Sequence, residues 1–245
     1  MHSMMSRCLL LFLLLLALVA CRDPEAERRE AEARAQAAQA RVEALANEAF
    51  GQFEAVQSTN KPELALAYAE DIISRYPNSE AAKRLADSMP ALRETARASA
   101  EKRRLESLWT YHAVDDAEAG GRVYTAYIRA SNNANLRLVL RRHPAWGQSV
   151  YLLSDAGEFS CVKECRVAAK ADGADLPKVL ISEVKGNVPP AVFLEEDQRM
   201  LDIIVKAETF EISPGLKKEG DKSFLFEVSA LDVEQLGPPV KGQNG

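Results

Sequence analysis

The stretch R-V-Y-T-A-Y-I-R-A at residues 122–130, with L-R-L-V-L-R at residues 136–141, decides the fold of the C-terminal half. Its β-branched and aromatic residues alternate: one face carries Val123, Thr125 and Tyr127, and the other carries Tyr124, Ala126 and Ile128. Alternation with a period of two is typical of a β-strand, and Gly120-Gly121 supplies a turn signal before it. We therefore predict a strand over each of these two segments.

Further strand-like segments continue toward the C-terminus, with turn signals between them. They are residues 149–154, 158–161, 166–170, 179–184, 191–194, 209–213 and 223–229. One helix interrupts them; we expect Asp197 to cap it, and its buried stripe to be Met200, Leu201, Ile204 and Ala207. Many short strands joined by turns predict an antiparallel β-sandwich-like domain over residues 108–236. Residues 237–245, which begin Gly-Pro-Pro, predict a disordered tail.

Residues 21–58 form the segment before the helical pair, and most of this segment predicts a helical tether. Residues 24–58 are rich in Ala, Glu, Arg and Gln, which are good helix formers. The expected buried stripe is Val42, Leu45, Ala49, Phe53 and Val56, with steps of three and four residues. The part before Val42 has only alanines to bury, so it indicates a tether. A short coiled-coil dimer is the alternative, although an alanine seam is weak.

Residues 59–107 predict a helical pair. The spacing of Asn60 and Glu63 resembles a capping box for a helix from about 61 to 76, which Tyr76-Pro77 would end. Ser79 is the predicted cap of the next helix, which runs to about Met89 before Pro90 breaks it. A further helical stretch is expected over residues 91–108. The fold class is therefore α+β, with a helical stalk and αα-hairpin before the β-sandwich-like domain.

Residues 65–92 contain A-x-x-x-A-E-D-I-I-S-R-Y-P-N-S-E-A-A-K-R-L. This segment resembles one helix–turn–helix of the tetratricopeptide-like outer-membrane lipoproteins, in which Y-P-x-S joins successive helices. The match covers about one repeat, whereas repeat proteins need about three units to bury a continuous core. An αα-hairpin docked on the next domain is favoured over a peptide-binding repeat groove.

The first twenty residues predict a secretory signal peptide, with Arg7 in the n-region and an unbroken apolar run over residues 8–20. That run is shorter than the about 20 residues that span a bilayer. Leu18-Val19-Ala20-Cys21 resembles the lipobox of bacterial lipoproteins. The resemblance implies cleavage before Cys21 and acylation of its sulfur, with palmitate-type chains as the membrane anchor. A plain signal peptide, with Cys21 in the core or in a disulfide, is the alternative.

Composition limits the classes of partner. The chain has 245 residues, 27% of them charged and 47% hydrophobic, and a net charge of −5. This balance is typical of a globular protein, and the acidic charge argues against a nucleic-acid partner. Arg22 follows Cys21 where an aspartate would favour the inner membrane, so the lipobox resemblance favours the outer membrane.

Cys161 and Cys165 are the two cysteines that remain after cleavage and acylation. In a continuous strand their Cα atoms would lie about 13 Å apart, whereas a disulfide requires less than about 7 Å. A bond therefore requires the chain to reverse between them, which the charged residues 163 and 164 allow. Residues 158–161 and 165–170 would then be hairpin partners. A zinc site that includes His143 is the alternative, but a fourth ligand is not evident; we predict a disulfide and no metal.

No motif predicts catalysis or a cofactor. The segment Gly147-Gln148-Ser149 lacks the second glycine of a nucleophile elbow. Residues 215–223 nearly spell a phosphate loop, but Asp221 interrupts it and flanking strands favour a hairpin turn. His112 with Asp115-Asp116 offers an acid–base pair, although a solvated loop is the more common role. Residues 195–197 are acidic and favour a helix start over a calcium site.

Arg137, Arg141, Arg142 and His143 predict a basic strand edge. Such an edge discourages strand-to-strand aggregation, and it offers cations to the phosphates of a lipid or glycan.

The blocks W-x-Y-x(3)-D, A-x-I-x-A-S-N-N, L-R-L-V-L-R-R and G-E-F-x-C resemble uncharacterised bacterial envelope domains, some of them linked to contact-dependent secretion. The resemblance implies a periplasmic β-domain without catalysis. We therefore expect a non-enzymatic, periplasm-facing envelope lipoprotein that scaffolds or binds a protein partner, and that contacts the membrane through its lipid. The alternative is a β-domain that binds, or hydrolyses, cell-wall material or a small ligand. A deep pocket lined by His112, Asp115, Asp116 and arginines would favour the alternative, and a flat domain with an exposed apolar strip would favour scaffolding.

Overall fold

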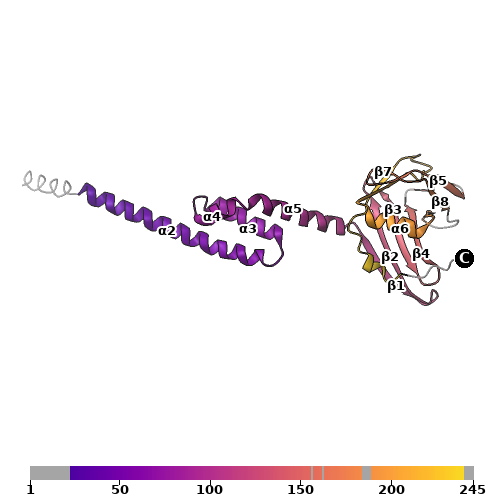
Figure 1. Ribbon diagram of the computed structural model, residues 1–245, viewed down its shortest axis with the longest axis horizontal. Helices are drawn as coiled ribbons and strands as arrows, with labels where there is room; N and C mark the ends of the chain where they lie inside the picture. The colour runs from indigo at the N-terminus through magenta and orange to yellow at the C-terminus, as the bar shows by residue number, and fades with distance from the viewer. Residues whose placement is uncertain (1–22, 156, 162, 184–188, 240–245) are drawn as a thin grey trace, which may run out of the picture. The chain divides into compact units, whose positions relative to one another are not determined.

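The structure is a computed structural model that describes residues 23–155, 157–161, 163–183 and 189–239. The predicted signal peptide and Cys21 lie outside these residues. The chain divides into two compact units, one ending at Ser99 and the other beginning at Ala100. The first unit is helical and the second contains two antiparallel sheets, which confirms the α+β class (Figure 1).

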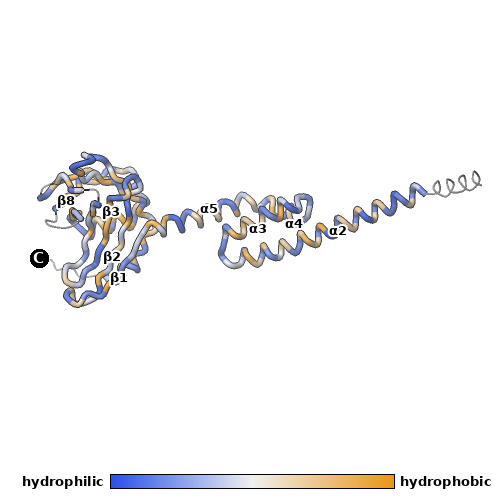
Figure 2. The backbone as a smooth tube through the Cα atoms, turned by 180° about the vertical axis from the view of Figure 1, so that it is seen from behind, coloured by the Kyte–Doolittle hydropathy of each residue, from blue (hydrophilic) through white to orange (hydrophobic). Residues whose placement is uncertain are grey.

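The helical unit begins with α2 (Pro24–Gln57). The Asp23 side chain accepts a hydrogen bond from the Glu25 amide at 3.0 Å, so an acidic cap lies at the positive end of the helix dipole. All residues from 23 to 42 are exposed, as expected for a tether, and hydrophobic positions become frequent in the second half of α2 (Figure 2). Among the described residues, no helix is both long and apolar enough to cross a membrane.

The predicted buried stripe of α2 is correct in its second half, where Phe53 is buried and Ala49 and Val56 pack against the core. Its first half is wrong. Ala46 and Phe53 are buried and Phe50 packs against them, whereas Val42 and Leu45 are 37% and 51% exposed. Steps of three and four residues fit two neighbouring stripes of one helix equally well. The observed stripe turns both phenylalanine rings, with centroids 5.6 Å apart, toward the other helices, which buries more apolar surface.

Three more helices follow: α3 (Pro62–Arg75), α4 (Glu80–Ala86) and α5 (Met89–Glu106). Ser79 caps α4 as predicted, because its hydroxyl accepts a hydrogen bond from the Ala82 amide at 3.1 Å. The predicted capping box of α3 is wrong. Asn60 has a φ of 56° in the turn after α2, and Lys61 is the residue at the N-cap. The helix break predicted at Pro90 falls before Met89, so Pro90 lies in the first turn of α5. Proline fits there because the first turn of a helix does not need its N–H.

One core joins α2, α3 and α4 and reaches the start of α5. Its buried residues are Ala46, Phe53, Ala65, Ala69, Ile72, Ala81, Leu85 and Met89. The division between the two units falls inside α5, so the last turns of this helix belong to the β unit. There Arg104 forms ion pairs with Glu101 at 2.7 Å and with Glu227 of β11.

The β unit contains a seven-stranded and a four-stranded antiparallel sheet (Figure 1). The large sheet has the order β1 (Thr110–Asp116), β2 (Gly121–Ala130), β3 (Asn133–His143), β4 (Gly147–Ser154), β9 (Ala191–Leu194), β8 (Val179–Glu183) and β5 (Glu164–Val167). The small sheet has the order β11 (Phe224–Glu227), β10 (Thr209–Ile212), β6 (Ala169–Ala171) and β7 (Ala174–Asp175). Helix α6 (Asp197–Lys206) and the 3₁₀ helix η1 (Val233–Leu236) complete the unit.

A single hydrophobic core contains residues from both sheets and α6. The predicted alternation in residues 122–130 is confirmed: Ala126, Ile128 and Ala130 are buried on one face of β2. Met200, Leu201 and Ile204 form the buried stripe of α6, as predicted. Trp109 is 5% exposed, and its indole N–H donates to the carbonyl of Ser229 at 3.3 Å.

Several predicted strands need correction. Residues 110–116, which were predicted as a loop around His112, form β1 and pair with β2 along its whole length. Residues 158–161 form no strand, and Phe159 makes a single bridge to Leu216. Residues 166–170 divide between β5 in the large sheet and β6 in the small one, because the chain crosses between the sheets there. The predicted hairpin of residues 158–161 with 165–170 is therefore wrong, since β5 pairs with β8.

The predicted disordered tail also begins too early. Leu236 is 1% exposed in the core, and the carbonyl of Gly237 accepts a hydrogen bond from Arg142. Gly237 has a φ of 67°, and a Cβ atom at this position would lie 2.6 Å from the Tyr124 ring. A glycine is therefore needed where the chain leaves η1. Residues 240–245 of the predicted tail lie outside the described residues.

Candidate functional site

A groove of about 480 Å³ lies between α2 and α3 in the helical unit. The groove follows residues spaced three or four positions apart on each helix. Its walls are Leu45, Glu48, Ala49 and Gln52 of α2, together with Leu64, Ala67, Tyr68, Asp71, Ile72 and Arg75 of α3 and Tyr76 after it.

The groove combines an apolar floor with a mixed rim. Ile72 is fully buried in the floor, whereas Leu45 and Leu64 are 51% and 43% exposed. On the rim, Arg75 pairs with Asp71 at 2.9 Å. Within the part of the chain that the structure describes, Glu48 forms no hydrogen bond or ion pair. The groove therefore offers apolar surface and one uncompensated carboxylate.

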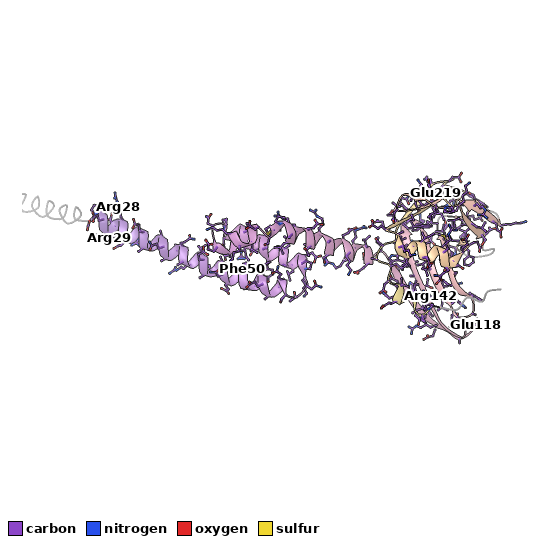
Figure 3. The ribbon with its side chains drawn as sticks, viewed as in Figure 1. Arg28, Arg29, Phe50, Glu118, Arg142 and Glu219 are labelled. Carbon is purple, nitrogen blue, oxygen red and sulfur yellow. A yellow bond between two sulfur atoms is a disulfide. The ribbon has the colours of Figure 1, made fainter. Side chains whose placement is uncertain are left out.

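The opposite side of α2 is covered by α4. The Arg84 guanidinium lies 4.0 Å from the centre of the Phe50 ring, and the Glu43 carboxylate accepts from the Glu80 amide at 3.2 Å (Figure 3 labels Phe50). At 100° per residue, Glu43 and Phe50 lie on the side of α2 opposite to Leu45 and the rest of the groove. The two sides of the α2–α3 pair thus differ: one is closed by α4, and the other is open.

A second surface lies on the face of the large sheet that is not turned toward the core. Tyr127, Tyr151 and Phe193 lie in one cross-strand row through Val139. On β3, Arg137 and Arg141 lie two residues to either side of Val139, so their side chains point to this same face. We call these six residues, together with Trp146, the arginine–aromatic strip.

The strip is held together by ring contacts. The Tyr151 and Phe193 rings meet edge to face, with centroids 5.5 Å apart. The Arg137 guanidinium lies 5.6 Å from the Tyr127 ring. The Arg141 guanidinium lies between two rings, 5.8 Å from Tyr151 and 5.2 Å from Trp146. Burial raises the pKa of the Tyr151 phenol, and the charges of the two arginines oppose that rise.

The two arginines of the strip differ in their partners. Arg137 pairs with Asp155 at 2.6 Å. Arg141 has no hydrogen-bond or ion-pair partner among the described residues, and its Nε is a buried donor without an acceptor. The Nε of Arg137 is likewise a buried donor without an acceptor among the described residues. A buried N–H without an acceptor is costly. The terminal nitrogens of Arg141 are not buried and have no acceptor among the described residues, so an anion can reach them.

The predicted basic strand edge is wrong, because β3 is an inner strand between β2 and β4. Arg142 points to the other face of the sheet, where its guanidinium donates to Gly237 and to Gln148 at 3.4 Å (Figure 3 labels Arg142). Burial lowers the pKa of Arg142. His143 stacks on Trp146 with ring centroids 3.9 Å apart, and its Nδ1 accepts from the Ala145 amide at 3.2 Å. His143 therefore shapes the β3–β4 turn and leaves Trp146 71% exposed.

The structure does not bring the predicted acid–base residues together. His112 stacks on Tyr127 with ring centroids 5.8 Å apart. Asp115 lies on the opposite face of β1 and is 3.9 Å from Arg122. Asp116 accepts hydrogen bonds from the amides of residues 118 and 119 at 2.9 Å and so shapes the next turn. Among the described residues, no group of three or more His, Cys, Asp or Glu is placed to hold a metal ion.

Cys161 and Cys165 form a disulfide, with their Cα atoms 5.8 Å apart. The chain reverses between them, as a bond requires, and Lys163 has a φ of 77° in this reversal. The sulfur of Cys161 belongs to the core, and the bond closes the loop that leads into β5.

The acidic residues 195–197 serve three separate structural roles. Glu195 accepts a hydrogen bond from the Ser182 hydroxyl on β8. Glu196, with a φ of 62°, is the N-cap residue of α6, so the prediction of Asp197 as cap is wrong. The Asp197 carboxylate instead accepts from the Val150 amide of β4 at 2.7 Å. Burial raises the pKa of Asp197, and this hydrogen bond opposes the rise.

The near-match to a phosphate loop is a turn, as predicted. β10 and β11 are antiparallel partners, and the bridge between Leu216 and Gly220 closes the turn between them. A phosphate loop would require a helix after the glycines, whereas a strand follows here.

Comparisons with protein-family models, with curated proteins and with solved structures found no match to this chain. The candidate sites therefore rest on the geometry of the groove and of the strip.

Proposed function

We propose that this protein is a non-enzymatic lipoprotein of the bacterial envelope that binds a partner protein as a scaffold. Acylated Cys21 anchors the protein in a membrane, and the outer membrane is favoured over the inner membrane. The two units face the periplasm. The lipobox resemblance of residues 18–21 supports the anchor. The exposed residues 23–42 suit a tether that holds a binding module away from a membrane surface.

The observation that carries the binding function is the open groove between α2 and α3. Leu45 and Leu64 are large apolar side chains that add little to folding where they are, because about half of each remains in contact with water. They line one continuous groove with a buried apolar floor, and a contiguous surface of this kind is typical of interaction sites.

We propose an amphipathic helix of the partner protein as the occupant. Rows of side chains three and four residues apart on a third helix fit between two packed helices, as in other helix-in-groove complexes. The groove walls already have this spacing on both helices. Because Glu48 has no hydrogen-bond or ion-pair partner among the described residues, a lysine or arginine beside the apolar stripe of the incoming helix would complement it.

A photo-crosslinking amino acid at Leu64, introduced in intact cells, tests this function. The matched control is the same amino acid at Ala98, which is exposed on α5 and lies outside the groove. We expect a discrete adduct from position 64 and none from position 98. Leu45→Glu should abolish that adduct without lowering the melting temperature, because Leu45 is exposed.

Two results would contradict the proposal. One is equal crosslinking from positions 64 and 98, which would indicate random collisions. The other is an adduct that survives Leu45→Glu, since the groove would then not hold the captured protein.

A further inference from the structure

We propose that the arginine–aromatic strip of the β unit binds an acidic glycan, that is, a sugar chain that carries carboxylates. This inference rests on the proposed function in one respect, because the proposed function places the β unit in the envelope, where sugar chains occur. It concerns a different unit from the groove and a ligand of a different class.

The charge of Arg141 is the first step. Its guanidinium lies between the Tyr151 and Trp146 rings without an anionic partner among the described residues. The planar fork of a guanidinium matches a carboxylate through two parallel hydrogen bonds. The Nε of Arg141 is buried, whereas its terminal nitrogens are not buried and have no acceptor among the described residues. A carboxylate at this position can therefore accept hydrogen bonds from both terminal nitrogens.

The second step is the row of rings. A pyranose ring has flat faces of C–H groups, which pack on aromatic faces through dispersion. Tyr127, Tyr151 and Phe193 lie in register across β2, β4 and β9, with Val139 of β3 between the two tyrosines. Three interstrand spacings of about 4.8 Å give a row of roughly 14 Å. That length exceeds a single sugar ring, so the row fits an oligosaccharide.

The third step is the arrangement of the cations relative to the rings. Arg137 and Arg141 lie on opposite sides of the row. Asp155 pairs with Arg137 and also with Arg129 at 3.7 Å, whereas Arg141 has no anionic partner among the described residues. Arg141 is therefore the position at which an anionic substituent is held. Tyr127, Tyr151 and Trp146 each already contact an arginine, and the parts of these rings that stay exposed, above all Trp146 at 71%, are accessible to a sugar.

Other polymers fit this surface less well. A peptide that adds as a strand needs a free sheet edge, whereas β3 and β4 are hydrogen-bonded on both sides. Single-stranded nucleic acid also stacks on aromatic rings, but it requires a positively charged track along its backbone. Here the strip has two arginines, and the neighbouring Arg129 shares Asp155 with Arg137, which makes no continuous positive track in a chain of net charge −5.

The test is a titration of the full chain, in nonionic detergent, with the probes named below. Tryptophan fluorescence measures the binding. The chain has two tryptophans, and Trp109 is 5% exposed in the core, so Trp146 is the reporter that a surface ligand can reach. The probes are a hyaluronan hexasaccharide, which has a carboxylate on every second sugar, and neutral chitohexaose. Inorganic phosphate and a uridine hexanucleotide test for an unspecific anion site and for nucleic acid.

We expect saturable binding of the hyaluronan hexasaccharide, at least tenfold tighter than that of chitohexaose. Arg141→Gln should weaken it at least tenfold. Arg199→Gln is the matched control, because Arg199 is a partly exposed arginine on α6 whose partner is Glu196 at 2.8 Å; it should leave the affinity unchanged. Equal melting temperatures would show that both variants remain folded.

The proposal is overturned if chitohexaose binds as tightly as hyaluronan, if Arg141→Gln binds normally, or if phosphate or the uridine hexanucleotide binds more tightly. Failure here is distinguishable from failure of the proposed function. Loss of glycan binding with a normal Leu64 adduct refutes this inference alone, and glycan binding without that adduct refutes the groove alone.

Discussion

The hydrogen bond between Asp197 and Val150 offers the sharpest test of how the β unit is assembled. Val150 is fully buried on β4, and its N–H reaches the Asp197 carboxylate of α6 at 2.7 Å. Asp197→Ala would remove the acceptor and leave a buried N–H unsatisfied. A hydrogen bond to a charged group is worth about 1.5–3 kcal/mol, so we expect a loss of about 2 kcal/mol. At roughly 2–4 °C per kcal/mol for a unit of this size, the melting temperature should fall by about 4–8 °C.

Asp197→Asn separates the hydrogen bond from the charge, because its side-chain oxygen can still accept from Val150. Burial raises the pKa of Asp197 in the folded state, so ionisation opposes folding. The contribution of this group to the free energy of unfolding is therefore greatest below its unfolded pKa. It falls as pH rises from the unfolded toward the folded pKa. We expect Asp197→Asn to abolish that decline and to lie much closer to the wild type than Asp197→Ala at neutral pH.

Thermal unfolding followed by circular dichroism between pH 4 and pH 8 measures both effects. Asp202→Ala is the matched control, because Asp202 is exposed on the same helix and, within the described part of the chain, accepts a hydrogen bond from Gln198 alone, at 2.8 Å. We expect the control to change the melting temperature little. If Asp197→Asn is as unstable as Asp197→Ala at neutral pH, or if Asp202→Ala matches both, the hydrogen bond does not hold α6 to β4.

Three further changes test other parts of the molecule. Cys21→Ser should abolish acyl labelling and block normal signal cleavage; a variant that still fractionates with membranes at the wild-type level would contradict the anchor. Reduction of the disulfide between Cys161 and Cys165 should lower the melting temperature of the β unit without unfolding it, because so short a loop contributes about 2 kcal/mol; two reactive thiols in unfolded, non-reduced mature protein would refute the bond. Ser79→Ala should destabilise the helical unit by about 1 kcal/mol in urea unfolding, because the cap of α4 is lost, and an unchanged midpoint would show that the cap contributes nothing.

The sequence predicted those elements whose local residue pattern is compatible with a single type of secondary structure. The alternation in residues 122–130 and the strand-like segment at residues 191–194 each predict one strand, and both strands are present. Ser79 was identified as a cap because its side chain acts within its own turn. These features depend on neighbours in the sequence, and distant packing does not change them.

Features that depend on contacts with residues far away in the sequence could not be predicted from the sequence. Residues 110–116 are mostly exposed, so β1 lacks the apolar alternation that reveals a strand, and it forms because β2 offers a free edge. Asp197 has a cap-like position, but its acceptor role is set by Val150, which is 47 residues away in the sequence. Arg137 and Arg141 were identified as a basic group. Their placement in the middle of a sheet follows only from the order of its strands.

The two surfaces share a physical property that argues for binding rather than for folding alone. Leu45 and Leu64 gain little from folding because they stay exposed, and the Nε atoms of Arg137 and Arg141 lose hydration without gaining an acceptor. A sequence shaped by stability alone would place polar residues along the groove and a shorter polar side chain at position 141. Each surface lacks one thing that the described residues do not supply: an apolar face for the groove and an anion for Arg141. Under our two proposals, a partner helix supplies the first and an acidic sugar the second.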